Sequence, residues 1–396
     1  MKYKTYKIKD LINEISMGPF GSNIKVECFV DSGIPVLNGS NLTGFALNDN
    51  SFRYVTPEKA DSLGKANAYR GDIVITHRGT LGQIVFIPEN SKHSRYVISQ
   101  SQFRVKCNEK ILPEYLVYYF HTNAGQHKLL SNASQVGVPA LARASTTFQT
   151  LEIDIPDVTE QRKIVDLLET IREKIELNNA INNNLEQQAM ALYENTFCTP
   201  SNIAMKHISL SDLMDYSGGS QPPASKFIFI KRDGYIRFVQ IRDYDTDSHI
   251  TYIPESAKNK LCEEHDIMIA RYGASLGRIC FGINGAYNVA LAKVFPKKSY
   301  FREFLRCYLS SRTFYEGINN KGGRSAQAGF NQSDINSFEL DFPIDEAIVQ
   351  KFENTVAPMF EQRLQLRKEN QRLASLRDTL LPKLMSGELD VSDIDL

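Results

Sequence analysis

Two turns in the chain carry side chains of the kinds that read the edges of DNA bases. The first lies in GDIVITHRGTLGQI at residues 71–84, and the second lies in HDIMIARYGASLGRI at residues 265–279. Arg and Lys donate in pairs to guanine, while Asn and Gln pair with adenine, so such residues in turns can distinguish base pairs in the major groove. The candidates are Thr76, His77, Arg78, Thr80 and Gln83 in the first turn, and Arg271, Tyr272, Ser275 and Arg278 in the second.

Other turns add further candidates. Polar residues follow apolar runs at comparable positions in the two halves, namely Asn38, Ser40 and Asn41, and then Gln240 and Arg242. Basic residues in Gly-rich or Ser-rich surroundings suit phosphate contacts, and these are Lys25, Arg143, Lys321 and Arg324. Every candidate has a second explanation, because Asn and Thr in turns commonly bond to the backbone and an exposed Arg is commonly solvated. The repetition favours DNA contact, since the glycines and Asp72/Asp266 match while the residues between them differ.

No catalytic or metal site accompanies these turns in the sequence. The chain lacks a GxxxxGK[ST] phosphate loop, and QPPA at residues 221–224 lacks the acid or amide and the aromatic residue of an amino-methyltransferase turn. His77 near Asp72 suggests a base with an orienting carboxylate, but an Asp before a strand is more typical of a turn. The six cysteines form no CxxC pair and the seven histidines no HExxH, so we expect neither a metal site nor disulfides.

Charge alternates along the chain although the net charge is zero. Lys and Arg number 17 against 13 Asp and Glu in residues 1–156, and 18 against 15 in residues 199–343. The intervening segment 157–198 has 4 against 8, and residues 344–396 have 7 against 10. Two mildly basic segments thus alternate with two acidic ones, but the excesses are small enough for an ordinary solvated surface.

The acidic segment 157–198 has the pattern of one long helix. It contains no Gly or Pro, Pro156 precedes it, Asp157 can cap it, and Glu160 suits the return bond of a capping box. At about 1.5 Å per residue the helix is roughly 58 Å long, which exceeds what one globular domain encloses. Its apolar residues alternate in steps of four and three, the spacing of a coiled-coil seam, at Ile164, Leu168, Ile171, Ile175, Leu185, Ala189 and Leu192.

Asn178 and Asn182 interrupt this seam. One explanation is a solvated middle of the helix. The other is that they meet polar groups of a partner helix and fix its register, for which Arg363, Asn370 or Arg377 are the candidates.

A second long helix is expected at residues 345–385, so the whole plan repeats after about 190 residues. FQTLEIDIP at residues 148–156 matches INSFELDFP at residues 335–343, and a helical pattern follows each. Pro358 lies inside the second helix and predicts a kink or a new start there. Either parallel or antiparallel pairing of the two helices satisfies the spacing.

The length of the chain predicts several domains, and its hydropathy predicts a cytoplasmic location. The 396 residues exceed what a single core supports, and the chain has neither a run of about 18 apolar residues nor the apolar stretch of a signal peptide. The expected divisions are residues 1–156, a first strand-rich domain; 157–198, a central helix; 199–343, a second strand-rich domain; 344–386, a second helix; and 387–396, a tail.

Seven stretches, taken in order, match the motifs of a known family. They are GPFGSNIK (18–25), PVLNGSNL (35–42), GDIVITHRGTLGQ (71–83), ASTTFQTLEIDIPDVTEQRKIVDLL (144–168), SGGSQPPAS (217–225), DIMIARYGASLG (266–277) and LRDTLLPKLMSGEL (376–389). In this order, over its full length, the chain resembles the specificity subunit of type I restriction-modification systems. It departs from the family at residues 341–352, where DFPIDEAIVQKF lacks the Glu-Gln pair present at Glu160 and Gln161.

The resemblance implies a fold, a function and partners. The fold is α+β, with two strand-rich mixed α/β target recognition domains joined by two long helices that form an antiparallel coiled coil, and with a pseudo-two-fold internal repeat. The implied function is recognition of a bipartite, asymmetric DNA target without catalysis. The implied partners are double-stranded DNA, two modification subunits docked on the helices, and restriction subunits, with no membrane. Those partners, and not this chain, would bind S-adenosylmethionine, ATP and magnesium.

Two alternatives remain open from the sequence. In the first alternative, the chain is the specificity subunit of a type IIB-like nuclease-methylase. In the second, it is a scaffold with two protein-binding domains that binds no DNA. The near-zero net charge is the main support for the scaffold.

Overall fold

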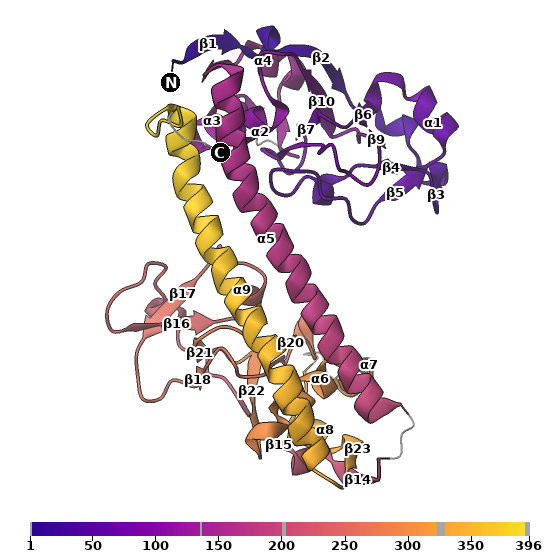
Figure 1. Ribbon diagram of the computed structural model, residues 1–396, viewed down its shortest axis with the longest axis vertical. Coiled ribbons are helices and arrows are strands. Elements are labelled where there is room, and N and C mark those ends of the chain that lie inside the picture. The colour runs from indigo at the N-terminus through magenta and orange to yellow at the C-terminus, as the bar shows by residue number, and fades with distance from the viewer. Residues whose placement is uncertain (1, 135–136, 200–202, 323–328, 393–396) are drawn as a thin grey trace. The chain divides into compact units, whose positions relative to one another are not determined.

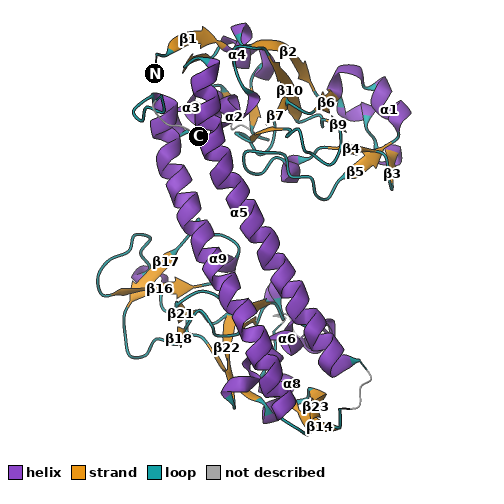
Figure 2. Cartoon of the chain, in the orientation of Figure 1, coloured by secondary structure: helices purple, strands orange, loops and turns teal. Residues whose placement is uncertain are grey.

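The computed structural model describes residues 2–134, 137–199, 203–322 and 329–392 (Figure 1). The chain forms two compact units, which are Met1–Ile175 with Gln371–Leu396, and Glu176–Asn370. Each unit mixes strands and helices (Figure 2), as the predicted α+β class requires. Two long helices are divided between the units, and each contributes one segment to the first unit and another to the second. They are α5 (Val158–Tyr193) and α9 (Ala347–Ser386).

The first unit is built around a four-stranded antiparallel sheet with the order β2-β10-β7-β8. Its strands are β2 (Ile12–Met17), β10 (Gln102–Cys107), β7 (Asp72–Thr76) and β8 (Ile84–Phe86). Side chains of β7 alternate between the two faces, so Ile73 and Ile75 enter one core while Val74 enters another. Because both faces are covered, the strand is apolar at every position between Asp72 and Thr76.

Helices cover one face of this sheet and a second sheet covers the other. The helices are α2 (Pro113–His121), α3 (Asn123–Leu129) and α4 (Ala144–Thr150), together with the ends of α5 and α9. The second sheet has the order β3-β5-β4-β9-β6, with strands β3 (Phe29–Val30), β5 (Arg53–Val55), β4 (Ile34–Val36), β9 (Arg95–Val97) and β6 (Asn67–Tyr69). Smaller elements are α1 (Pro57–Ser62), the pair β1 (Lys4–Lys7) and β13 (Glu152–Ile155), and the pair β11 (Ala133–Ser134) and β12 (Ala140–Leu141).

The second unit repeats this plan. Its central sheet has the order β15-β22-β19-β20, with strands β15 (Met214–Gly218), β22 (Leu291–Pro296), β19 (Met268–Ala270) and β20 (Ile279–Cys280). Its second sheet has the order β17-β16-β21-β18, with strands β17 (Thr251–Pro254), β16 (Tyr235–Val239), β21 (Gly285–Tyr287) and β18 (Leu261–Cys262). The remaining elements are α6 (Arg302–Ser310), α7 (Arg312–Gly322), α8 (Gln332–Asn336), and the pair β14 (Met205–Ser209) and β23 (Glu339–Pro343).

The repeat extends to the direction of the strands and confirms the prediction from the sequence. The parallel pair β4–β9 of the first unit has its counterpart in the parallel pair β16–β21 of the second. An ion pair also recurs, buried in the first unit and partly exposed in the second. Asp72 bonds to Arg104 of β10 at 3.3 Å, and Asp266 pairs with Lys293 of β22 at 2.6 Å. Each aspartate also accepts the backbone N–H three residues earlier, which is the turn role expected for it.

Within each unit the two helix segments run antiparallel. In the second unit, Asn178 bonds to Asn370 while Glu186 bonds to Arg363, so the numbering falls on one helix as it rises on the other. In the first unit, residues 164–168 of α5 share a core with residues 381–385 of α9. This is the orientation that the family resemblance supplied and the spacing left open.

Asn178 holds the register of the seam in the second unit. Its side chain is fully buried, and its Nδ2 donates to Glu369 Oε2 and to Asn370 Oδ1, both at 2.9 Å. Asn370 Nδ2 donates in turn to Asn179 Oδ1 at 2.9 Å. Asn370 is therefore confirmed as a partner of the seam asparagines.

The other proposed partners have different roles. Arg363 donates to Glu186 Oε2 at 2.9 Å, and Arg377 lies over the ring of Phe45 in the first unit. The Oδ1 atom of Asn182 is buried and accepts no hydrogen bond from the described residues. The predicted new start at Pro358 is wrong, because α9 continues through this residue as a single helix.

The start of α5 is held by Gln161, which is fully buried. Its Oε1 accepts the backbone N–H of Leu112 at the start of α2, and its Nε2 donates to the carbonyl oxygens of Lys110 and Pro156, all at 3.0 Å. Asp157 caps the helix by accepting the N–H of Glu160 at 3.0 Å. The Gln of the Glu-Gln pair thus joins the long helix to the domain that precedes it.

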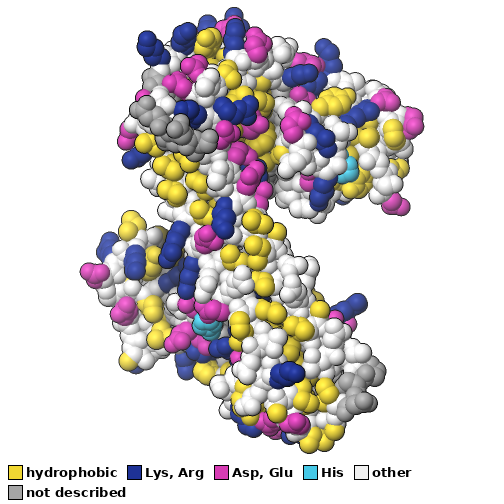
Figure 3. All heavy atoms as spheres, in the orientation of Figure 1, with side chains coloured by type: hydrophobic (Ala, Val, Ile, Leu, Met, Phe, Trp, Pro, Cys, Tyr) yellow, Lys and Arg dark blue, Asp and Glu magenta, His cyan; other side chains and the backbone are white. Residues whose placement is uncertain are grey.

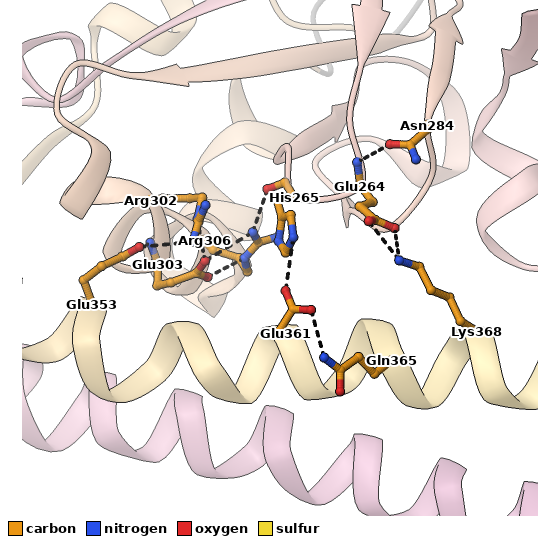
Figure 4. Close-up of polar contacts among 10 residues, drawn as sticks. All are labelled: Glu264, His265, Asn284, Arg302, Glu303, Arg306, Glu353, Glu361, Gln365 and Lys368. Carbon is orange, nitrogen blue, oxygen red and sulfur yellow. Dashed lines mark hydrogen bonds and ion pairs between the residues drawn. The ribbon is translucent and has the colours of Figure 1, made fainter.

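The second unit makes the equivalent connection with another residue. Glu353 of α9 accepts the N–H of Glu303 near the start of α6 at 2.8 Å, and Glu303 in turn accepts from the buried Arg306 at 2.6 Å (Figure 4). A contact of His265 with Glu361 at 3.2 Å and the ion pair Glu264–Lys368 extend the junction along α9. The second unit therefore has its own junction between the long helix and the domain, although it lacks the Glu-Gln pair.

Replacing Gln161 by Ala should destabilise the first unit. The substitution leaves one buried N–H and two carbonyl groups without their partner, and an unsatisfied buried polar group costs about 1–3 kcal/mol. We expect thermal unfolding of the full chain to shift to lower temperature. The exposed Gln187 of the same helix provides the control, since its replacement by Ala should change the unfolding free energy by less than about 0.5 kcal/mol. Equal effects of the two substitutions would contradict the role of Gln161.

Candidate nucleic-acid interface

The turns that carry the candidate base-reading residues lie at one end of each central sheet. In the first unit, Met17 ends β2, Thr76 ends β7 and Gln102 begins β10, and the strand register places all three at the same end. In the second unit Gly218, Ala270 and Leu291 have the equivalent places. We call this the loop end of each sheet. Because the two faces of each sheet are covered, the loops at this end are where the sheet can meet a large ligand.

Arg78 and Thr80 are exposed at the first loop end, in the turn between β7 and β8. Arg78 forms an isolated antiparallel bridge with Ala140, which brings the segment before α4 alongside the turn. That segment ends at Arg143, which is exposed and has a left-handed backbone with φ of 48°. Among the described residues, the guanidinium groups of Arg78 and Arg143 have no hydrogen-bond or ion-pair partner. Both are therefore available to an anionic ligand.

His77 is half-buried beside these residues. Its Nε2 lies 3.2 Å from the carbonyl oxygen of Gln100, and burial lowers the pKa of the ring below its usual value. The ring is therefore neutral at pH 7 and supplies hydrogen bonds without charge. Asp72 lies at the opposite end of β7, so the two residues do not form a base and its orienting carboxylate.

Gln83 braces the first turn against the neighbouring sheet. Its Oε1 accepts the hydroxyl of Thr76 at 3.0 Å, and its Nε2 donates to the carbonyl oxygen of Gly39 at 2.9 Å. Thr76 is buried, so its hydroxyl serves this brace. The brace fixes the turn of Arg78 relative to the turn at residues 38–41.

The residues of the 38–41 turn bond mainly to one another. Asn38 Oδ1 accepts from the backbone N–H of Ser40 at 2.8 Å, and Asn41 Oδ1 accepts the N–H of Asn38 at 3.0 Å. Asn41 is fully buried and also donates to the carbonyl oxygens of Asn48 and Asn50. Asn41 and Thr76 thus have the structural role that was the second explanation, whereas Asn38 and Ser40 remain exposed.

Arg278 makes the equivalent brace in the second unit. It occupies the position of Gln83, directly after a glycine with positive φ, and its two terminal nitrogens donate to the carboxylate of Asp245 at 2.9 and 2.6 Å. These hydrogen bonds lower the pKa of Asp245, so the pair is ionised at neutral pH. Gln240 caps the turn that leads to Asp245 and donates to the hydroxyl of Thr251 at 3.3 Å.

Arg271 and Tyr272 form a stacked pair at the second loop end. The guanidinium carbon of Arg271 lies 5.1 Å from the ring centre of Tyr272 and 5.7 Å from that of Phe330. The Nε of Arg271 is buried without a partner among the described residues. Tyr272 bridges to Gly329 just as Arg78 bridges to Ala140, and its side chain is exposed. Ser275 is half-buried in the same turn.

The remaining basic candidates are less constrained. Lys25 is exposed and pairs weakly with Glu27 at 3.7 Å, and the exposed Arg242 lies 3.9 Å from Asp243. The side chain of Lys321 and the whole of Arg324 lie outside the described residues. On the face shown in Figure 3, basic and acidic side chains are interspersed on both units, which agrees with the small charge excesses in the sequence.

The first loop end includes two residues that the sequence analysis did not select, Phe20 and Gln100. Phe20 is 83% exposed, and the adjoining Gly21 approaches the side chain of Gln100. The signal for Phe20 was present in the GPFG stretch, where an aromatic residue stands between glycines that make close contacts. Gln100 carries no comparable signal in the sequence.

Among the described residues, no three His, Cys, Asp or Glu side chains are placed together so that they could hold a metal ion. The six cysteines all lie in the described ranges and are free thiols. Among the described helices, none combines the length and apolar character that a membrane crossing requires.

Comparison with known proteins identifies the family. The family model described as the type I restriction modification DNA specificity domain matches residues 2–187 and 202–364. The chain belongs to this family. It is 25% identical to the type I restriction enzyme MjaIX specificity subunit of Methanocaldococcus jannaschii, over 98% of this chain and 94% of that protein. It is 23% identical to the HindI specificity subunit of Haemophilus influenzae, over 88% and 93%.

A solved structure shares the fold. The crystal structure of the type I restriction-modification S subunit from M. genitalium aligns with a TM-score of 0.62 at 14% identity, over 97% of this chain and 96% of that one. As a type I specificity subunit, the chain recognises DNA and is not catalytic, and it works in an assembly with other restriction-modification subunits. The type IIB-like and scaffold alternatives are not favoured.

Replacing Arg78 by Ala should weaken binding to the cognate DNA of the assembled complex. A lost base contact costs about 1–3 kcal/mol and relaxes specificity at one position, whereas a lost phosphate contact weakens all sequences alike. Equilibrium binding to cognate and scrambled duplexes separates the two. Lys9 is an exposed basic residue beyond the opposite end of the same sheet, so Lys9→Ala should leave both affinities unchanged. Unchanged cognate binding by Arg78→Ala would remove Arg78 from the interface.

Proposed function

We propose that the two units each read one half of a bipartite, asymmetric DNA target and that the loop ends carry the reading side chains. The supporting observation is the repeat itself. Three features that hold the turns recur in both units: the ion pairs, the glycines with positive φ, and the braces at Gln83 and Arg278. The exposed residues differ, with Arg78 in one turn and Tyr272 in the other. Two copies of one scaffold with different exposed side chains suit two different half-sites.

The long helices would set the unread gap between the half-sites. Each helix supplies one segment to each unit, so the length of the helices would fix the spacing. The bonds of Asn178 to Asn370 and Glu369 would keep the register from slipping, because a shifted seam would bury these amides without partners.

The partners proposed for this assembly are two modification subunits docked on the helices, and restriction subunits. S-adenosylmethionine would be bound by the modification subunits, and ATP and magnesium by the restriction subunits. This chain would bind none of them. Its place of action would be the cytoplasm, where DNA and these subunits are found together in a bacterial or archaeal cell.

Methylome sequencing of cells that express this chain with its cognate modification subunit tests the two-reader proposal. We expect one split methylated motif. Exchanging residues 1–155 for the equivalent domain of a relative should change one half of the motif and leave the other intact. If no split motif is methylated, or if the exchange alters both halves or neither, the proposal fails.

Lengthening both helices together tests the proposed spacing role. One seven-residue repeat inserted after Ile175 in α5 and another after Asn370 in α9 keep the seam in phase and add about 10 Å. The unread gap of the methylated motif should grow by about three base pairs, at about 3.4 Å each. The same insertion in α5 alone serves as the comparison, because it puts the antiparallel seam out of register. A functional double insertion with the original gap would refute the spacing role.

A further inference from the structure

The Gly18-Pro19-Phe20-Gly21 turn presents an aromatic side chain at the first loop end. Phe20 is 83% exposed, the highest exposure among the large hydrophobic residues that the structure describes. The turn leaves the end of β2, and the N–H of Gly18 donates to the carbonyl oxygen of Gln102 at 2.8 Å. Phe20 therefore projects from the end of the sheet at which the reading residues gather.

The backbone around Phe20 is held closely. A Cβ atom on Gly18 would lie 1.9 Å from the carbonyl oxygen of Ser99, and one on Gly21 would lie 2.2 Å from Gln100 Oε1. The carbonyl oxygen of Phe20 accepts the N–H of Asn23 at 2.8 Å. The two glycines thus let the turn sit directly against residues 99–100, and the aromatic ring is the part that remains outside.

The surroundings of Phe20 match nucleic acid. The carbonyl oxygen of Gln100 lies 3.2 Å from the ring nitrogen of His77, and His77 adjoins Arg78, whose side chain is exposed. Lys25 follows on the same segment with a side chain that is 62% exposed. A protruding aromatic ring flanked by exposed cations suits a base stack bordered by phosphates, because the ring stacks on bases while the cations meet the backbone.

The second unit has a related feature in the corresponding segment, which joins β15 to β16. Phe229 and Ile230 are 72% and 77% exposed, and the exposed Lys231 and Arg232 follow directly. The base of this loop is fixed, since Ile228 exchanges two backbone hydrogen bonds with Tyr252 at 3.0 and 2.8 Å. Exposed apolar side chains beside cations thus occur on this segment in both units, although Phe20 directly follows the central-sheet strand β2 whereas Phe229 lies beside β17 of the second sheet.

We propose that Phe20 is a wedge that stacks into the DNA duplex and opens a base step at or beside the first half-site. The wedge contributes affinity through stacking and leaves direct reading of base edges to the polar residues of the loop end. It rests on the proposed function, because the ring meets bases only if the first loop end faces DNA.

The test uses the complex of the full chain with its cognate modification subunits and a duplex that carries the methylated motif. 2-Aminopurine replaces single bases in turn through the first half-site and its flanks, since the fluorescence of this base rises when it is unstacked. The methylated base is left out of the scan, because methyltransferases flip their target base out of the stack, and for the wild-type complex we expect a rise at one other step. Phe20→Ala should abolish the rise and weaken binding about 5-fold to 150-fold, the range found for loss of an aromatic stacking partner. Phe20→Trp should retain both signals.

Two further variants separate the wedge from other effects. Lys25→Ala should reduce the salt dependence of binding by about one phosphate contact while the fluorescence rise remains. Tyr69 is an exposed aromatic residue of the same unit, on β6 and preceding the Asp72 end of the sheet, so Tyr69→Ala should leave binding and fluorescence as in the wild type.

Several results would overturn the wedge. Wild-type binding and an unchanged fluorescence profile for Phe20→Ala would show that the ring does not enter the duplex. Loss of assembly with the modification subunits in this variant, with the fluorescence rise intact in the complex that does form, would instead assign Phe20 to a protein contact. If the complex methylates a split motif and no position shows a rise, the wedge fails while the proposed function stands. Absence of any methylated split motif would remove the proposed function first.

Discussion

The antiparallel packing of α5 against α9 is the contact on which both cores depend. In the first unit, Ile164 and Leu168 of α5 share a core with Leu381 and Leu384 of α9. In the second unit, Tyr193 of α5 contacts Phe304 of α6, and Phe197, just beyond α5, contacts Phe352 of α9 in the same core. Each domain is thus completed by two helix segments that are far apart in sequence. A buried polar interruption at Asn178 keeps their register, because an all-apolar seam would tolerate sliding.

The burial of the central sheets explains where a ligand can bind. Helices cover one face and a second sheet covers the other, so polar residues that are free for recognition are confined to the ends of strands. At the Asp72 end the ion pair with Arg104 fastens the sheet. At the loop end the glycines with positive φ and the braces of Gln83 and Arg278 hold the turns, while Arg78 and Tyr272 remain exposed. The frame can therefore stay constant while the exposed positions vary.

Much of this fold could be predicted from the sequence, because its signals are periodic. The alternation of strand residues, the steps of four and three along the helices and the repeat of about 190 residues each depend on many positions, so single exceptions such as Pro358 do not hide them. The family resemblance supplied the antiparallel direction, which seam spacing alone does not contain. Asn370 was among the expected partners of the seam asparagines because it lies at an interrupting position of the other helix.

The candidate site was harder to predict, because residue type alone does not distinguish a side chain that fixes a turn from one that is free to contact a base. Asn41 and Arg78 both suit a DNA contact in sequence, yet Asn41 is fully buried and satisfies three backbone groups while Arg78 is exposed. Gln83 and Arg278 look like base readers and serve to fix turns. The distinction depends on the approach of a second sheet, a non-local contact. The role of Glu353, which takes the place of Gln161 at the second junction, could not be predicted either, because it also depends on a non-local contact.

The division of the two units along the chain has a consequence for synthesis on the ribosome. The second unit is one continuous stretch, residues 176–370, whereas the first requires residues 371–392 to close its core around Leu381, Leu384 and Val391. The domain that is translated first is therefore the last to be completed. At about 5–20 residues per second, its helix-facing surface waits for about 10–40 s while the intervening residues are made. During that interval the apolar face that receives α9 is open, and the nascent chain is vulnerable to aggregation and to chaperone capture at that surface.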